Sequence, residues 1–140
     1  MIKYITFAVA ILLGYQLAEA QVTQTSHYTF SADKAKQIKL ELDGSVEVRE
    51  RGGSRILIEV HVQVDNGNNG ILANWVKEGR YDVLAEVTPE SDLLRVYSRE
   101  RQAEEKYHQT DNLRLKCNEK VSYIVYVPYG MKTSQRKLEE

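Results

Sequence analysis

The sequence contains a single cysteine, Cys117, among 140 residues. One thiol excludes an intrachain disulfide and a zinc site built from several cysteines. A domain of this size without disulfides must therefore be held together by an ordinary hydrophobic core. Because Cys117 follows Leu113 and Leu115 at alternate positions, we expect a buried thiol that packs as a small hydrophobic group. An exposed Cys117 would leave an intermolecular disulfide open.

Neither sign of charge is in excess. The chain has 19 Lys and Arg against 20 Asp and Glu, which gives a formal net charge of −1. Such a balance provides no electrostatic attraction to nucleic acid or to an anionic membrane. We therefore expect neither of them as a partner.

The chain also lacks the uninterrupted run of roughly 20 apolar residues that a membrane-spanning helix needs. Residues 5–13, apolar apart from Thr6, follow the positive charge of Lys3. The segment Ala18-Glu19-Ala20 then matches the small-residue site that signal peptidase reads. We predict a signal peptide over residues 1–20, cleaved after Ala20, and no lipid anchor or stable membrane insertion afterwards. The mature protein is expected in the periplasm or outside the cell.

Motifs of common enzyme classes are missing. The sequence has no G-x-S-x-G, H-E-x-x-H, G-x-G-x-x-G or P-loop. We therefore expect no enzymatic activity, no catalytic residues, no cofactor and no metal.

Apolar residues alternating with polar ones dominate the mature chain after a polar lead over residues 22–26. This period of two is typical of strands with one buried face. It occurs around residues 38–42, 46–48, 56–64, 81–87, 94–98 and 113–117. We predict an all-β fold, an antiparallel meander or sandwich of about seven or eight strands, as a single domain over residues 21–130.

Four turns agree with these alternating faces if each joins two antiparallel strands. Three-residue loops are expected at Asp43-Gly44-Ser45, Arg51-Gly52-Gly53 and Asn118-Glu119-Lys120, and a four-residue loop is expected at residues 89–92. These loops pair core residues with core residues. The predicted pairs are Leu42 with Val46, Val48 with Ile56, Cys117 with Val121 and Val87 with Leu94.

One segment has helical spacing. Ile71, Leu72, Trp75 and Val76 predict a short helix over Gly70-Glu78 that crosses between sheet layers, with Gly79 as its left-handed cap. The single tryptophan is expected to fill one edge of the core. The charged residues 99–111 suit an exposed loop or a surface helix, and residues 131–140 are predicted to be a polar, frayed tail.

Three polar groups have residue types that occur in binding sites, and a plain structural role is favoured for each. The loop at residues 65–70 has one carboxylate, too few for calcium, so a turn is expected. Glu59, His61 and Gln63 share a strand face, while His27 and His108 are isolated, so a solvated face is expected rather than a metal site. The arginines around residues 52–53 offer an anion site, offset by nearby glutamates.

Three tyrosines, Tyr123, Tyr126 and Tyr129, lie in a strand with apolar residues on both faces. Core packing in a central strand is the favoured interpretation. The alternative is an exposed aromatic strip that binds a partner or a glycan, and these three residues are the candidate binding surface.

The order of elements resembles the N-terminal part of the “putative adhesin” domains of unknown function that Bacteroidota export. The resemblance rests on "IKLELDGSVEVRERGGSRILIEVHVQV", the short helix with its Trp, and "VSYIVYVPYG", and it covers residues 36–130. It implies a β-roll of repeats after such a module, and we expect this chain to be too short to contain those repeats. We expect an exported, non-enzymatic domain with an adhesin-like or structural role in the envelope, whose partner is an envelope protein or a glycan. The alternative is a periplasmic sensor or accessory protein that binds a small ligand between its sheets.

Overall fold

The computed structural model describes residues 21–33, 35–88, 90–99, 107–110 and 113–136, with the backbone alone for residues 107–110 and 113–116. The predicted signal peptide, residues 1–20, lies outside the described residues. So does most of the charged segment, namely residues 100–106 and 111–112.

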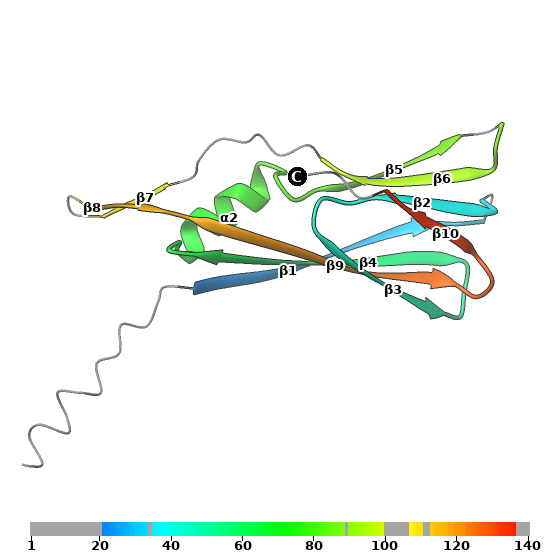
Figure 1. The fold of residues 1–140 in the computed structure, drawn as a ribbon, viewed down its shortest axis with the longest axis horizontal. Coiled ribbons are helices and arrows are strands. Elements are labelled where there is room, and N and C mark those ends of the chain that lie inside the picture. Colours follow the sequence, from blue (N-terminus) through cyan, green and yellow to red (C-terminus); the bar gives the residue numbers. More distant parts are fainter. Residues whose placement is uncertain (1–20, 34, 89, 100–106, 111–112, 137–140) are drawn as a thin grey trace, which may run out of the picture.

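Two four-stranded sheets pack face to face (Figure 1). The long sheet has the order β1-β4-β9-β3, with β1 at Gln21–Ser31, β4 at Arg55–Asp65, β9 at Asn118–Pro128 and β3 at Ser45–Arg51. The short sheet has the order β10-β2-β6-β5, with β10 at Lys132–Gln135, β2 at Gln37–Glu41, β6 at Leu93–Ser98 and β5 at Val83–Thr88. A separate hairpin joins β7, Tyr107–Thr110, to β8, Leu113–Lys116. The predicted all-β architecture is confirmed.

The predicted meander is wrong in its connections. The sheets are mixed, because β2 pairs in parallel with both β10 and β6, and β3 pairs in parallel with β9. The expected pair Leu42 and Val46 does not form, because the chain crosses from the short sheet to the long sheet between β2 and β3. The expected pair Val48 and Ile56 does not form either, because β9 lies between β3 and β4.

Two further turns have opposite outcomes. Residues 118–120 are not a loop but the start of β9, and Val121 pairs with Val62 rather than with Cys117. The loop after β5 is confirmed in its register, because Val87 pairs with Leu94. The polar lead is also strand, within the 11-residue β1, and the tail predicted to be frayed contains strand β10.

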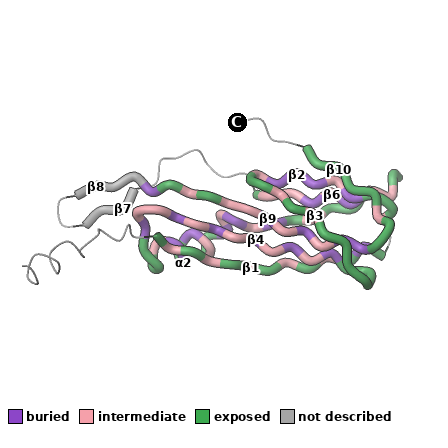
Figure 2. The backbone as a smooth tube through the Cα atoms, turned by 60° about the horizontal axis from the view of Figure 1, so that its bottom comes forward, coloured by how far each residue is buried: buried purple, intermediate pink, exposed green. Residues whose placement is uncertain are grey.

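The core lies between the sheets, where residues at alternate positions of β2, β4, β6 and the second half of β9 are buried (Figure 2). The fully buried side chains are aliphatic with one tyrosine, and they are Ile38, Leu40, Ile56, Ile58, Leu72, Leu94, Val60, Val64, Val96, Val125, Val127 and Tyr123. Burying a single such aliphatic side chain stabilises a fold by about 1.5–3 kcal/mol. The opposite face of the long sheet is left to the polar members of each alternation.

Helix α2, Asn69–Lys77, covers the part of the long sheet that extends beyond the shorter strands (Figure 1). The Asn68 side chain accepts a hydrogen bond from the Ile71 N–H at 2.8 Å and so caps the helix, as Asn does at this position. Trp75 is buried, and Gly79 ends the helix with a positive φ of 78°. The predicted helix, its sheet-crossing role and its tryptophan are therefore confirmed.

The single thiol is buried, as the sequence predicted. Cys117 has 6% of its surface exposed, and its Sγ lies 3.4 Å from the carbonyl oxygen of Asn66.

Candidate functional site

The outer face of the long sheet gathers polar side chains from all four of its strands. Directly paired residues of neighbouring strands point to the same side, so the register defines rows across this face. The rows are Thr23, Gln63 and Lys120; then Thr25, His61, Ser122 and Ser45; then His27, Glu59, Ile124 and Glu47; then Thr29, Leu57, Tyr126 and Arg49. Residues of β1 and β9 in the same row are therefore 97 positions apart in the sequence, as Thr23 and Lys120 are (120 − 23).

The first two rows surround a depression of about 600 Å³, which we call the polar depression. Its lining is formed by Thr23, Gln24, Thr25, Ser45, His61, Val62, Gln63, Lys120, Val121 and Ser122. The lining offers hydroxyl, amide, imidazole and ammonium groups beside apolar surface, and it contains no carboxylate. Such groups donate and accept hydrogen bonds to a polar ligand.

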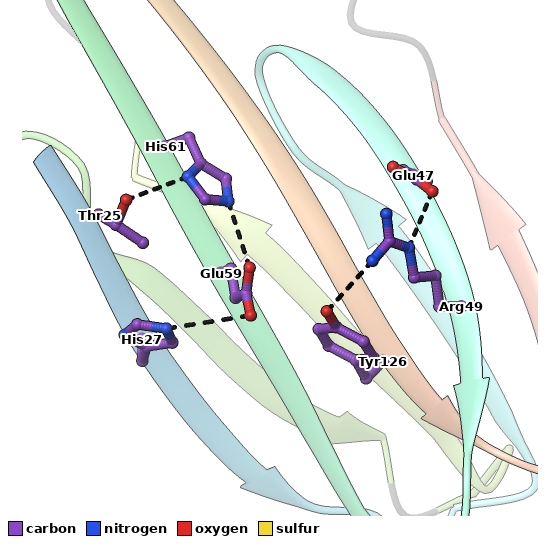
Figure 3. A network of polar contacts seen from close by, with 7 residues as sticks. All are labelled: Thr25, His27, Glu47, Arg49, Glu59, His61 and Tyr126. Carbon is purple, nitrogen blue, oxygen red and sulfur yellow. Dashed lines mark hydrogen bonds and ion pairs between the residues drawn. The ribbon is translucent and has the colours of Figure 1, made fainter. Parts of the chain in front are cut away.

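Next to the polar depression, in the third row of the same face, Glu59 lies between two histidines (Figure 3). His61 Nε2 lies 3.3 Å from Glu59 Oε2, and His27 Nε2 lies 4.0 Å from Glu59 Oε1. The other ring nitrogen of His61, Nδ1, lies 3.1 Å from Thr25 Oγ1. The sequence interpretation that His27 is isolated is therefore wrong, because pairing of β1 with β4 places it beside Glu59.

The side chains of Thr25, His61 and Glu59 contact one another in the order of nucleophile, base and orienting acid in hydrolase triads. Acyl transfer also needs donors aimed at the developing oxyanion, usually backbone N–H groups. Here the three side chains stand on the face of a paired sheet, whose backbone N–H groups lie in the sheet plane rather than pointing out of it. The arrangement thus fixes the orientation of His61 without supplying that part of a catalytic site. Among the described residues, no group of three or more His, Cys, Asp or Glu side chains is placed to hold a metal ion.

The far end of the same face is partly apolar. Leu57 pairs with Tyr126, and Ile124 lies in the adjacent row. Arg49 Nη1 donates to the Tyr126 hydroxyl at 3.4 Å, and Arg49 Nε donates to Glu47 Oε1 at 2.8 Å (Figure 3). The Glu47 carboxylate raises the pKa of Arg49, so this guanidinium is engaged by its neighbours.

The three candidate tyrosines do not form one strip. Tyr123 is 1% exposed and faces the core, so its place in a binding surface is a wrong prediction. Tyr126 points to the outer face, and Tyr129, 71% exposed, follows the end of β9. Alternation along a strand separates Tyr123 from Tyr126 onto opposite faces. The prediction of a central strand is confirmed, because β9 lies between β4 and β3.

Two other groups from the sequence have structural partners. Asp65 Oδ1 accepts from the amide groups of Gln21 and Gln63 at 3.2 and 3.3 Å, and Asn68 caps the helix. Of the three arginines around the turn at residues 52–53, Arg49 binds Glu47, whereas Arg51 and Arg55 are exposed.

The edge of the polar depression is anchored from beneath at the start of β9. Arg80 donates to both carboxylate oxygens of Glu119, at 2.7 and 2.9 Å, and the Tyr81 hydroxyl donates to Glu119 Oε1 at 3.0 Å. The hydrogen bonds to Glu119 raise the pKa of Arg80, and burial followed by the charge of Glu119 raises the pKa of Tyr81. Since Lys120 follows directly and points outward, these bonds fix the strand that presents it.

A glycine brings the loop between β2 and β3 against the same part of β9. Gly44 has a φ of 152°, and a Cβ at this position would collide with the carbonyl oxygen of Val121. Only glycine allows this close approach. Ser45, the next residue, thereby reaches the row of His61 and Ser122.

No protein-family model matches the chain, and no curated protein matches it significantly. A solved structure named "putative cell adhesion protein" from Clostridium sporogenes is similar over 81% of this chain, with 11% identity and a TM-score of 0.39. The match covers 46% of that protein, so this chain spans less than half of its length. The Bacteroidota family expected from the sequence stays a prediction.

In the part of the chain that the structure describes, no helix has the length and apolar character needed to cross a membrane.

Proposed function

We propose that the protein is exported and acts in the cell envelope as a non-enzymatic binding domain, with the outer face of the long sheet as its binding surface. The observation that supports this most strongly is the polar depression, where seven side chains of four strands, Thr23, Thr25, Ser45, His61, Gln63, Lys120 and Ser122, face one space of about 600 Å³. A solvated sheet face needs no such concavity, whereas ligand sites are concave.

Packing between the sheets argues against the alternative of a small ligand bound there. Ile38, Ile58, Val60, Val96 and Val125 each have 0% exposure, so aliphatic side chains occupy the space between the two layers. The polar depression opens on the outside instead. An open face suits a polymer or a protein surface better than a small molecule, which sites usually bury by 70–90% or more.

Support for export comes from the sequence. The charged start, the apolar residues 5–13 and the Ala18-Glu19-Ala20 site together match the pattern of a cleaved signal peptide. N-terminal sequencing of the protein recovered from the host cell envelope or medium is expected to begin at Gln21. An intact Met1 on the exported protein would contradict cleavage.

Binding through this face is tested by blocking it. Thr25→Trp places a large side chain at the polar depression, and Thr88→Trp places the same side chain on an exposed position of the other sheet as a matched control. The mature protein is screened against immobilised glycans and envelope fractions. We expect Thr25→Trp to lose the binding that Thr88→Trp retains. Equal binding by both variants would refute the proposed surface.

The non-enzymatic part of the proposal has its own test. An activated ester such as p-nitrophenyl acetate reports on acyl transfer by the group Thr25, His61 and Glu59. We expect the wild-type rate to equal that of Thr25→Ala. A wild-type rate that falls at least tenfold in Thr25→Ala would show that this group is catalytic.

A further inference from the structure

Charge is distributed unevenly over the outer face of the long sheet. Lys120 is exposed at the polar depression, and among the described residues it makes no ion pair. It is the one permanently charged side chain of the lining, since His61 is the other ionisable group there and is bound to Thr25 and Glu59. The polar depression therefore offers an ammonium group to an anion, next to neutral hydroxyl and amide groups.

Carboxylates lie on both sides of the polar depression: Asp65 lies in the row of Gln21 and Asn118, next to the first row, and two more lie in the third row. Glu59 and Glu47 lie there, engaged respectively by His61 and by Arg49. A ligand with several closely spaced anionic groups would bring one of them against these carboxylates. Like charges placed close together oppose binding, so the charge pattern favours a ligand with a single anionic group over Lys120 and neutral groups elsewhere.

The row of polar side chains beside Lys120 is spaced at an interval that matches the repeat length of a polymer. Thr25, His61, Ser122 and Ser45 lie on four adjacent strands, and strands in a sheet are spaced by about 4.8 Å. This spacing is close to the length of one sugar residue in an extended polysaccharide. A glycan lying across the strands would meet one polar side chain per sugar.

Resting on the proposed function, we infer that the polar depression binds a sparsely charged acidic polysaccharide, one in which uronic acids alternate with neutral sugars. A uronate carboxylate pairs with the Lys120 ammonium. The hydroxyl groups of the neighbouring sugars bond to the row from Thr25 to Ser45.

Three probes separate the parts of this inference. They are an oligosaccharide of alternating glucuronate and N-acetylglucosamine, the same oligosaccharide with its carboxyl groups reduced to alcohols, and heparin as a densely sulfated chain. Affinity is measured by calorimetry at two salt concentrations. We expect the alternating oligosaccharide to bind most tightly. Carboxyl reduction should weaken binding about two- to fivefold, the range for an exposed ion pair.

The variant Lys120→Gln is expected to lose the same two- to fivefold for the charged oligosaccharide and nothing for the reduced one. Lys132→Gln, at an exposed lysine of the short sheet, is the matched control and should leave both affinities unchanged. Tighter binding of heparin, an equal loss for the reduced oligosaccharide, or no binding of any probe would overturn the inference. In those cases, binding of a neutral glycan or a protein that Thr25→Trp loses and Thr88→Trp retains would leave the proposed function standing.

Discussion

Removal of the Glu119 carboxylate, beneath the polar depression, is expected to destabilise the protein strongly. Glu119→Ala deletes the acceptor of three hydrogen bonds, two from Arg80 and one from Tyr81. The side chains of Arg80 and Glu119 are 12% and 17% exposed, so water replaces the lost partner poorly.

The magnitude follows from this partial burial. Breaking a buried ion pair by deleting one partner costs about 3–5 kcal/mol. Because the pair keeps some exposure, we expect the lower end, about 3 kcal/mol. For a domain of this length, that corresponds to a fall in Tm of roughly 10 °C.

The assay is urea unfolding followed by tryptophan fluorescence and, in parallel, by far-UV circular dichroism. Trp75 is the only tryptophan, it is buried, and the Arg80 guanidinium lies 5.7 Å from its ring centre. The fluorescence therefore reports on this region directly. Tyr81→Phe removes one of the three bonds and should cost about 1 kcal/mol. Glu90→Ala, at an exposed glutamate, should change stability by less than about 0.5 kcal/mol.

A Glu119→Ala loss below that of Tyr81→Phe would refute the reasoning, because it would show that the Arg80 bonds contribute nothing. A loss as large as predicted, with Glu90→Ala unchanged, would support the anchoring of β9 beneath Lys120.

Three further predictions concern single positions. Gly44→Ala should destabilise by about 1–3 kcal/mol, the cost of a strained backbone, and weaken ligand binding because the collision with Val121 displaces Ser45; unchanged urea midpoint and affinity would contradict this. Burial, and then the hydrogen bond to Asp82, raises the pKa of Tyr28 to about 12. The contribution of the protonated Tyr28 hydroxyl to the free energy of unfolding is therefore complete below about pH 10 and is lost as pH rises toward 12. Wild type should therefore lose more stability than Tyr28→Phe between pH 10 and pH 12, and parallel curves would disprove this. Buried Cys117 should react with a thiol reagent only at the rate of unfolding, whereas rapid labelling of the native protein would show that it is accessible.

Alternation was sufficient to find most strands, because it depends on each strand having one buried face. Ile56, Ile58 and Val60 show this plainly, since all three have 0% exposure. Pairing was harder to predict. The hairpin that joins Val87 to Leu94 was predictable because its partners are close in sequence, and a short loop fixes the register.

The wrong hairpins have different causes. A three-residue loop that keeps core residues on one side is equally consistent with a crossing to the other sheet, as at Gly44. Nor can local pattern show that β9 inserts between β3 and β4, since that contact joins Val125 to Val48 and to Ile58 over more than 60 residues. The faces of the residues on either side of a short turn cannot predict parallel pairing, because a short turn joins only antiparallel strands.

Only part of the candidate site can be predicted from the sequence. Glu59, His61 and Gln63 were singled out as one strand face, but their neighbours Thr25 and His27 lay in or next to a stretch interpreted as a polar lead. The signal that was available is the alternation of exposed and half-buried residues through Gln21–Ser31, with Tyr28 and Phe30 on the inner side. Lys120 was missed because it was assigned to a turn.

Backbone amide NMR can show, residue by residue, whether the outer face of the long sheet binds the ligand. The mature protein is titrated with the alternating glucuronate oligosaccharide while its amide shifts are followed. We predict that the largest shifts cluster at Thr25, His61, Lys120 and Ser122, while Thr88 on the outer face of the short sheet stays unchanged. Saturable shifts centred on the short sheet, with the polar depression unaffected, would contradict the claim.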